Sequence, residues 1–197
     1  MIRRSFGILT ACLLGVSAAV SRAEVTLPDL FGDHAILQRS QSTAVWGRAK
    51  PGEVVSVGIG EASDRVKTGT DGWWMAKIDT RRLGDGPFEL KVVGPHDSVV
   101  SKDVLVGEVW LAGGQSNMEF KMRWWPFGAV MDLDRRKADC KGRPIRMFRA
   151  RQRKDSDPFK DDAPIAWDAK GAWTVVSPAT LESVTAVGYS FIDTLQK

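Results

Sequence analysis

Short apolar segments separated by turn residues recur from residue 24 to about residue 103, and this pattern limits the fold more than any other feature of the chain. The segments are too short for helices, and no helical period of convincing length crosses them. The separators combine Pro, Gly and Asp, which favour tight turns. We therefore predict a β-sandwich over residues 24–103, with about 80 residues to build a core. The expected strands are residues 44–46, 54–59, 73–78, 88–93 and 99–100.

Aromatic and histidine residues of this region fit a structural role. Trp46 and Trp73 suit core or strand-face positions, and Trp74 is the better candidate for exposure, because neighbouring residues of a strand face opposite sides of a sheet. His34 and His96 are the two histidines of the whole chain. We interpret both as structural side chains of the predicted β-sandwich.

A short apolar run at residues 109–112 is followed by two glycines and then by Ser116. The run predicts a buried strand, and the glycines predict a sharp turn. A serine just after a strand on such a turn is where an α/β hydrolase presents its nucleophile, beside backbone N–H groups that face a developing oxyanion. The fuller Gly-x-Ser-x-Gly pattern is absent, because Met118 stands at its last position. Spacing alone therefore favours an ordinary polar loop.

Beyond Ser116 the sequence predicts a strand within residues 144–149, a connection over residues 163–176 and a final helix over about residues 181–196. Thr180 or Ser183 is the expected N-cap of that helix. Its apolar residues recur at helical spacing, so one face needs a sheet to cover it. These residues are Val184, Val187, Phe191, Ile192 and Leu195.

Residues 121–154 hold twelve Lys or Arg and three Asp, with aromatic residues between them. Such a stretch can bind nucleic acid, but that is the weaker interpretation for a chain that carries an export signal. It can also attract an acidic ligand such as a sugar carboxylate. A solvated, locally basic face is at least as well supported by the pattern.

Several blocks resemble one known family in the same order along the chain. The most specific is Gly-Glu-Val-Trp-Leu-Ala-Gly-Gly-Gln-Ser-Asn-Met-Glu at residues 107–119, which resembles the nucleophile block of the sialate O-acetylesterases, a branch of the SGNH hydrolases. Leu-Phe-Gly-Asp-His-Ala-Ile-Leu-Gln-Arg at residues 30–39 resembles the opening segment of that family. Weaker matches follow the same order at residues 45–53, 71–74, 145–148, 173, 177–178 and 186–189.

The resemblance implies an amino-terminal β-sandwich followed by the incomplete start of an SGNH-type α/β/α hydrolase domain, over residues 104–197. It implies Ser116 as the nucleophile, with backbone N–H groups of Ser116 and Gly114 at the oxyanion. The family also uses an Asn from a later block and an Asp-x-x-His near its carboxyl end. Asn117 is the one asparagine in the sequence, and neither histidine stands in Asp-x-x-His. We therefore expect an amino-terminal fragment of such an esterase that is inactive alone.

Residues 1–23 have the basic start, apolar centre and small-residue exit of a secretory signal peptide. The apolar run is shorter than the roughly 20 residues of a spanning helix, so no stable membrane anchor is expected. A lipobox ending at Cys12 is the minor alternative. Removal of residues 1–23 leaves 25 basic and 24 acidic residues, so net charge gives no support for a nucleic-acid partner. It also leaves Cys140 without a disulfide partner.

These observations predict a secreted or periplasmic serine O-acetylesterase that acts on acetylated carbohydrate and uses no cofactor and no metal. The cysteines and histidines show no metal-ligand spacing. The alternative is a secreted, non-catalytic carbohydrate-binding β module whose hydrolase half has decayed. The nucleotide sequence past codon 197 separates the two, because a continuing frame with Asp-x-x-His supports the enzyme.

Overall fold

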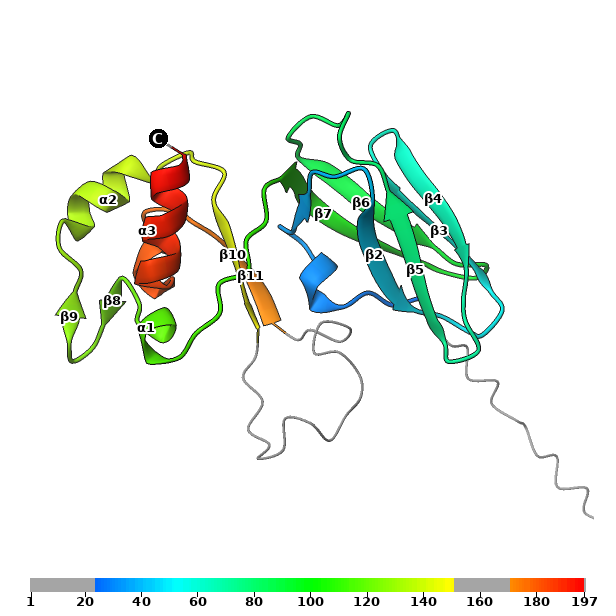
Figure 1. The fold of residues 1–197 in the computed structure, drawn as a ribbon, viewed down its shortest axis with the longest axis horizontal. Helices are drawn as coiled ribbons and strands as arrows, with labels where there is room; N and C mark the ends of the chain where they lie inside the picture. The colour runs from blue at the N-terminus through cyan, green and yellow to red at the C-terminus, as the bar shows by residue number, and fades with distance from the viewer. Residues whose placement is uncertain (1–23, 151–170, 197) are drawn as a thin grey trace, which may run out of the picture.

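The computed structural model describes residues 24–150 and 171–196, which form mostly strands and few helices. Figure 1 shows a strand-rich part and a smaller mixed part, with β10 (Arg146–Ala150) and β11 (Gly171–Val175) between them. We call residues 24–107 the strand-rich part and the remaining described residues the mixed part. The predicted signal peptide, residues 1–23, lies outside the described residues. No helix in the two described ranges is both long and apolar enough to cross a bilayer.

Seven strands follow a short 3-10 helix, η1 (Asp29–Phe31), in the strand-rich part. They are β1 (Ile36–Gln38), β2 (Thr43–Arg48), β3 (Val54–Ile59), β4 (Ala62–Lys67), β5 (Trp73–Ile78), β6 (Phe88–Val93) and β7 (Ser98–Gly107). Five of them form one mixed sheet in the order β1-β7-β6-β3-β4, in which only the β1–β7 pair is parallel. The other two, β2 and β5, form a separate antiparallel pair.

One apolar cluster joins the five-stranded sheet to the β2–β5 pair. The burial of β3 alternates along the strand, so that Val55, Val57 and Ile59 are inside, as the two-residue period of a strand requires. Trp74 is the largest fully buried side chain among the described residues. A Cβ atom at Gly47 would stand 2.6 Å from a Trp74 ring carbon. Glycine at this strand position therefore makes room for the indole.

The predicted strands at residues 54–59, 73–78 and 88–93 match β3, β5 and β6. The expected exposure of Trp74 is wrong, because this side chain is 2% exposed and Trp73 is the half-buried neighbour. The prediction that Trp73 and Trp74 face opposite sides was correct. Which of the two is buried depends on Gly47 of β2, because the missing side chain leaves space for the Trp74 indole. The guanidinium of Arg48 lies 4.2 Å from the centre of the Trp73 ring and covers it instead.

Two strands of this part were not predicted. β1 is only three residues long, and β4 reads Ala-Ser-Asp-Arg-Val-Lys with no buried residue, so neither gives a strong apolar pattern. β7 was predicted only at residues 99–100 and continues to Gly107. The domain limits of 24–103 and 104–197 stay a prediction, although strand pairing runs past the first limit.

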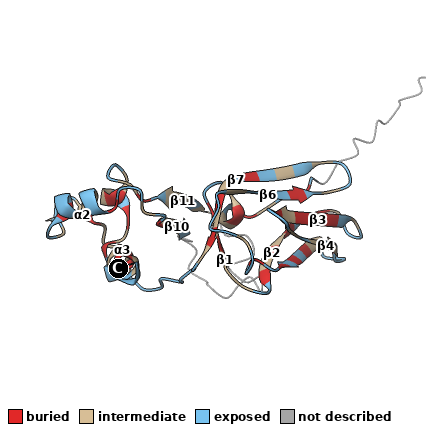
Figure 2. Ribbon diagram, turned by 90° about the horizontal axis from the view of Figure 1, so that it is seen from above, coloured by how far each residue is buried: buried red, intermediate tan, exposed pale blue. Residues whose placement is uncertain are grey.

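The mixed part contains short elements around a second apolar cluster. They are α1 (Ser116–Glu119), β8 (Arg123–Trp124), β9 (Gly128–Ala129), α2 (Leu133–Asp139), β10, β11, η2 (Leu181–Ser183) and α3 (Ala186–Leu195). The cluster includes Met122, Cys140, Ile145, Leu181 and Tyr189, all fully or nearly fully buried. Burial raises the pKa of the Cys140 thiol and of the Tyr189 hydroxyl. Figure 2 shows α2 with most of its surface exposed.

The β10–β11 pair connects the two parts. The indole nitrogen of Trp173 donates to the Leu30 carbonyl oxygen over 2.9 Å, and the Gly171 N–H donates to Asp29 over 3.0 Å. The Arg146 guanidinium donates to the Asp103 carboxylate over 2.8 Å, and the Arg146 side chain is 7% exposed. The strand predicted within residues 144–149 is confirmed as β10, whereas β11 lies in the stretch predicted as a connection.

Two predictions for the mixed part are wrong. Residues 109–112 form no strand, and Leu111 is 100% exposed. A buried strand needs neighbours that satisfy its backbone groups, and no strand in the described ranges pairs with residues 108–114. The final helix begins later than predicted, because Thr185, rather than Thr180 or Ser183, accepts a hydrogen bond from a first-turn N–H.

The predicted apolar face of the final helix lies only partly inward: Val184 is 4% exposed and Ile192 packs against the apolar cluster of the mixed part. Val187, Phe191 and Leu195 are each about half exposed. Ala186, Tyr189 and Asp193 are the side chains that α3 buries. A polar residue, Asp193, therefore belongs to the inner face, which hydrophobic spacing alone does not indicate.

Candidate active site

The chain leaves β7 at Gly107 and reaches Ser116 through an exposed segment, residues 108–114. Ser116 is the first residue of α1, and Gln115 is its N-cap, whose carbonyl oxygen accepts from the N–H groups of Met118 and Glu119. A Cβ atom at Gly114 would lie 3.2 Å from the Met118 Cβ. A small residue before the helix therefore lets the turn fold closely over α1.

Ser116 is exposed, and its hydroxyl faces no fixed partner. Within residues 24–150 and 171–196, neither this hydroxyl nor the backbone N–H of Ser116 or Gly114 forms a hydrogen bond. The first N–H groups of a helix have no partner within the helix. The two N–H groups are thus available to a negatively charged oxygen, which is the chemistry of an oxyanion site.

Two contacts from distant parts of the chain hold α1. Arg149 of β10 donates to the Glu119 carboxylate over 3.0 Å, and the Thr185 hydroxyl lies 3.7 Å from the Met118 sulfur. Sequence reasoning missed Arg149, because a pair of charges 30 positions apart leaves no local pattern. Trp110 contacts Phe191 of α3 edge-on, with ring centres 5.3 Å apart. The serine turn is therefore anchored on β10 and α3.

The described residues do not give Ser116 a base. The His34 ring and the Asp103 carboxylate are joined by a 2.7 Å hydrogen bond in the strand-rich part. This bond, helped by Arg146, holds the pKa of Asp103 below its usual range. This contact is consistent with the structural interpretation of His34, which stays a prediction. In the described ranges, no hydrogen bond joins the Ser116 hydroxyl to a histidine or a carboxylate. A serine hydroxyl without a base is a poor nucleophile.

Six of the nine cations within residues 121–150 form an ion pair with a carboxylate. Within the described residues 121–150, this pairing weakens the hypothesis that the stretch attracts an acidic ligand. Glu182 binds two of the cations, and the hydrogen bond from Lys137 is the main reason that its pKa is lowered. The pairs are Arg123–Glu182, Lys137–Glu182, Arg135–Asp132, Arg135–Asp139, Arg143–Asp193, Arg146–Asp103 and Arg149–Glu119.

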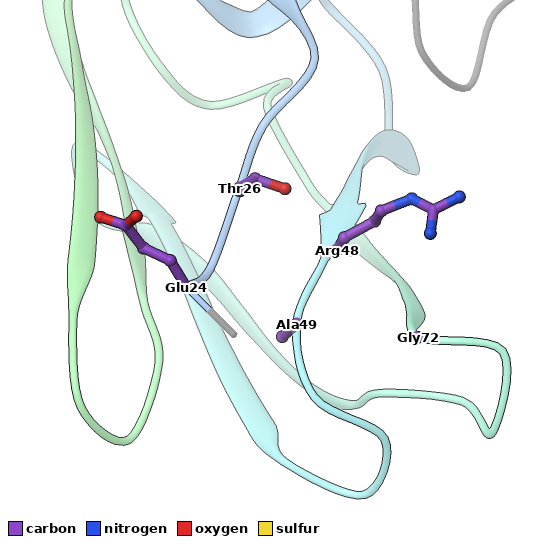
Figure 3. Close-up of a pocket in the computed structure, with 5 residues that line it drawn as sticks. All are labelled: Glu24, Thr26, Arg48, Ala49 and Gly72. Atoms are coloured by element: carbon purple, nitrogen blue, oxygen red, sulfur yellow. The ribbon is translucent and has the colours of Figure 1, made fainter. Parts of the chain in front are cut away.

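A hollow of about 280 Å³ opens away from this site, in the strand-rich part. Its lining residues are Glu24, Thr26, Arg48, Ala49 and Gly72. Figure 3 shows the side chains of Glu24 and Arg48 pointing away from each other, so they do not converge on a ligand. In the part of the chain that the structure describes, no three His, Cys, Asp or Glu side chains gather to hold a metal ion.

Comparison with known proteins finds sialate O-acetylesterases among the similar sequences. The chain is 30% identical over 125 residues to the sialate O-acetylesterase of Mus musculus, which covers 58% of this chain and 23% of that protein. It is 34% identical over 96 residues to the sialate O-acetylesterase of Homo sapiens, which covers 43% of this chain and 18% of that protein. The chain resembles the amino-terminal portion of the sialate O-acetylesterases.

A solved structure extends this resemblance to the fold. A carbohydrate acetylesterase from Xanthomonas citri superposes with a TM-score of 0.72 at 34% sequence identity, over 87% of this chain and 37% of that one. No protein-family model matches the chain. The chain spans less than a quarter of the length of the sialate O-acetylesterases named above. The predicted resemblance to this family is thus confirmed for its amino-terminal portion.

Proposed function

We propose that this chain is the amino-terminal portion of a secreted carbohydrate esterase that removes O-acetyl groups from sialic acid or a related sugar. The similarity to sialate O-acetylesterases and to a carbohydrate acetylesterase supports the substrate class. The observation that carries the proposal is Ser116 at the start of α1, exposed and next to two unpaired N–H groups. On this proposal the strand-rich part is a β-sandwich, and the mixed part begins an SGNH-type α/β/α domain.

The proposed reaction assigns one step to each group of the turn. The Ser116 Oγ attacks the acetyl carbonyl carbon, and its proton passes to a base. The N–H groups of Ser116 and Gly114 donate to the oxyanion of the tetrahedral intermediate. The sugar oxygen leaves with a proton, and water then releases acetate from the acyl-serine. The base is proposed to be a histidine from a part of the parent esterase outside these 197 residues, because His34 and His96 are the two histidines in the sequence.

Loss of a triad member commonly leaves a small fraction of the rate, so this chain alone should hydrolyse acetyl esters weakly or not at all. The measurement is the release of 4-nitrophenol or acetate from an acetyl ester by residues 24–197, beside Ser116→Ala. We expect both rates to stay near that of buffer. Strong turnover that disappears in Ser116→Ala would support the nucleophile and contradict the proposed incompleteness.

A chimaera tests the nucleophile directly. Residues 24–197 are fused to the part of the Xanthomonas citri acetylesterase that this chain does not match. We expect acetate release that Ser116→Ala lowers at least about a thousandfold. Full activity in the Ser116→Ala chimaera would show that another residue attacks the ester.

A non-catalytic carbohydrate-binding module is the second candidate function. It is favoured by the separate apolar core of the strand-rich part and by the lack of a described base at Ser116. This candidate predicts that residues 24–197 bind sugar while the folded chimaera releases no acetate. Acetate release that depends on Ser116 contradicts it.

Export is the remaining part of the proposal. Cleavage after Ala23 would give a mature protein that begins at Glu24. Mass spectrometry of exported protein measures this end directly. An intact Met1, or a lipid on Cys12, is the result that excludes such cleavage.

A further inference from the structure

The loop between β8 and β9 presents two aromatic side chains to solvent. Trp125 is 88% exposed and Phe127 is 75% exposed, which makes them the most exposed aromatic side chains of the described residues. They stand on either side of Pro126 in the turn that joins Trp124 to Gly128. Aromatic side chains at the surface expose a large apolar area, so such a pair is costly unless something covers it.

A row of rings fixes this loop to the protein. The half-buried Trp124 ring lies 5.5 Å from Phe120 and 6.4 Å from Phe127, between ring centres. Phe120 in turn packs against the apolar cluster of the mixed part. The Phe127 ring therefore has one edge against Trp124, while most of its surface stays open to a ligand.

The same row begins next to the serine turn. Phe120 directly follows α1, the helix that Ser116 begins. Four helical residues rise about 6 Å, which is close to the width of one sugar ring. Figure 1 shows β8 beside α1. The row therefore starts one short helix away from Ser116 and leads to Phe127 through Trp124.

The loop residues themselves, from Trp124 to Gly128, carry no charge, which suits an uncharged ligand surface. Arg123, the cation closest to the loop in sequence, is bound by Glu182 over 3.1 Å. Glu182 also binds Lys137, so two cations share this one carboxylate. A polyanion such as nucleic acid needs available cations along its backbone. The flat apolar C–H face of a pyranose needs only the π faces of aromatic rings.

We propose that Trp125 and Phe127 form a stacking subsite for a sugar ring of the substrate, next to the ester position at Ser116. This subsite rests on the proposed carbohydrate esterase function. It adds a second point of attachment, which determines the saccharide that is presented to the serine.

The test measures binding by the full chain and does not depend on turnover. The protein is labelled with 5-fluorotryptophan, and the Trp125 fluorine signal is assigned with Trp125→Phe. The probes are methyl β-D-galactopyranoside, which is neutral, and the methyl α-glycoside of N-acetylneuraminic acid, which is acidic. We expect both probes to shift the Trp125 signal, with little change in affinity between low and high salt.

Substitutions then locate the binding surface. Trp125→Ala and Phe127→Ala should each weaken binding about two- to tenfold, as expected for the loss of one aromatic contact. Met131→Ala is the matched control, because Met131 is 85% exposed and has no ring. It should leave the affinity unchanged. Equal affinities in all three variants would overturn the subsite.

Other occupants give different results. A Trp125 signal that moves with protein concentration in the absence of sugar would assign the loop to contact with a second copy of the chain. Binding that high salt abolishes would assign it to the basic residues. Either result overturns the subsite. If the chimaera binds sugar through Trp125 and Phe127 but releases no acetate, the subsite is supported and the proposed esterase function is contradicted.

Discussion

The strand-rich part and the mixed part bury their apolar residues in different ways. In the strand-rich part, all seven strands find partners between residues 36 and 107 and enclose one continuous cluster. In the mixed part, short elements surround a smaller cluster, while Trp110, Leu111 and Phe191 stay exposed or half exposed. A fold whose strands all find partners within one segment completes itself in that segment. A fold built around a buried central strand depends on neighbours from elsewhere in the sequence.

The contrast also concerns polar groups. The strand-rich part buries few charged groups, whereas the mixed part places the Arg143–Asp193 ion pair against its core, with both side chains less than a fifth exposed. The mixed part therefore relies more on matched charges. We expect the loss of one charge to destabilise the mixed part. We expect the loss of apolar volume to destabilise the strand-rich part.

The largest expected effect is in the core of the strand-rich part. Trp74→Ala removes the largest fully buried side chain there and should lower the free energy of unfolding by about 3–5 kcal/mol. Urea denaturation measures this change. Trp125→Ala is the control, because its exposed side chain should change the stability by no more than about 0.5 kcal/mol. Similar losses in the two variants would contradict the assignment of the core.

A smaller effect is expected at the buried ion pair of the mixed part. Asp193→Asn leaves Arg143 without its carboxylate and should cost about 1.5–3 kcal/mol, confined to the mixed part. Limited trypsin digestion should then cut residues 121–150 earlier, with residues 40–100 protected as before. Asp139→Asn, at an exposed pair with Arg135, is the matched control. Simultaneous cleavage of both parts would show that they unfold as one unit.

The junction between the parts should respond to acid. The pKa of Asp103 is lowered in the folded protein, chiefly by its hydrogen bond with His34 and further by Arg146. Its contribution is therefore present above the unfolded value of about 4 and is lost as the pH falls through the lower folded pKa. Because Asp103 is partly exposed, we expect less than about 1 kcal/mol.

The measurement for this junction is the stability difference between the native chain and Asp103→Asn from pH 6 to pH 2.5. Asn keeps the left-handed backbone that Asp103 adopts at φ 54°. The difference should shrink below about pH 4. Asp134→Asn, at an exposed carboxylate of α2, should show no such dependence. A constant difference at every pH would rule out the charge of Asp103 as its cause.

The smallest effect is expected on the outer face of α3. Val187 is 47% exposed although helical spacing assigned it to the inner face. Val187→Ser should change the free energy of unfolding by no more than about 0.5 kcal/mol. In the chimaera with the carboxyl-terminal part of the solved relative, the same substitution should cost more if that part covers α3. An equal cost in both proteins would show that this face stays open.

Local patterns predicted much of the strand-rich part. Turn residues and apolar segments gave the bounds of β3, β5 and β6, because a strand and its turns are specified by residues that are adjacent in sequence. The same kind of pattern located the turn before Ser116. It missed β4, whose residues are mostly polar, since its pairing with β3 and not its hydrophobicity makes it a strand.

The sequence by itself determined the bounds of β3, β5 and β6, the turn before Ser116 and the likeness to sialate O-acetylesterases. Only the tertiary structure decided that Trp74 is buried over Gly47, that α3 turns Asp193 inward, and that Arg149 holds α1. The physical reason is separation along the chain. Periodicity and turn chemistry are local properties, whereas the phase of burial and the pairing of charges depend on residues that meet only after folding.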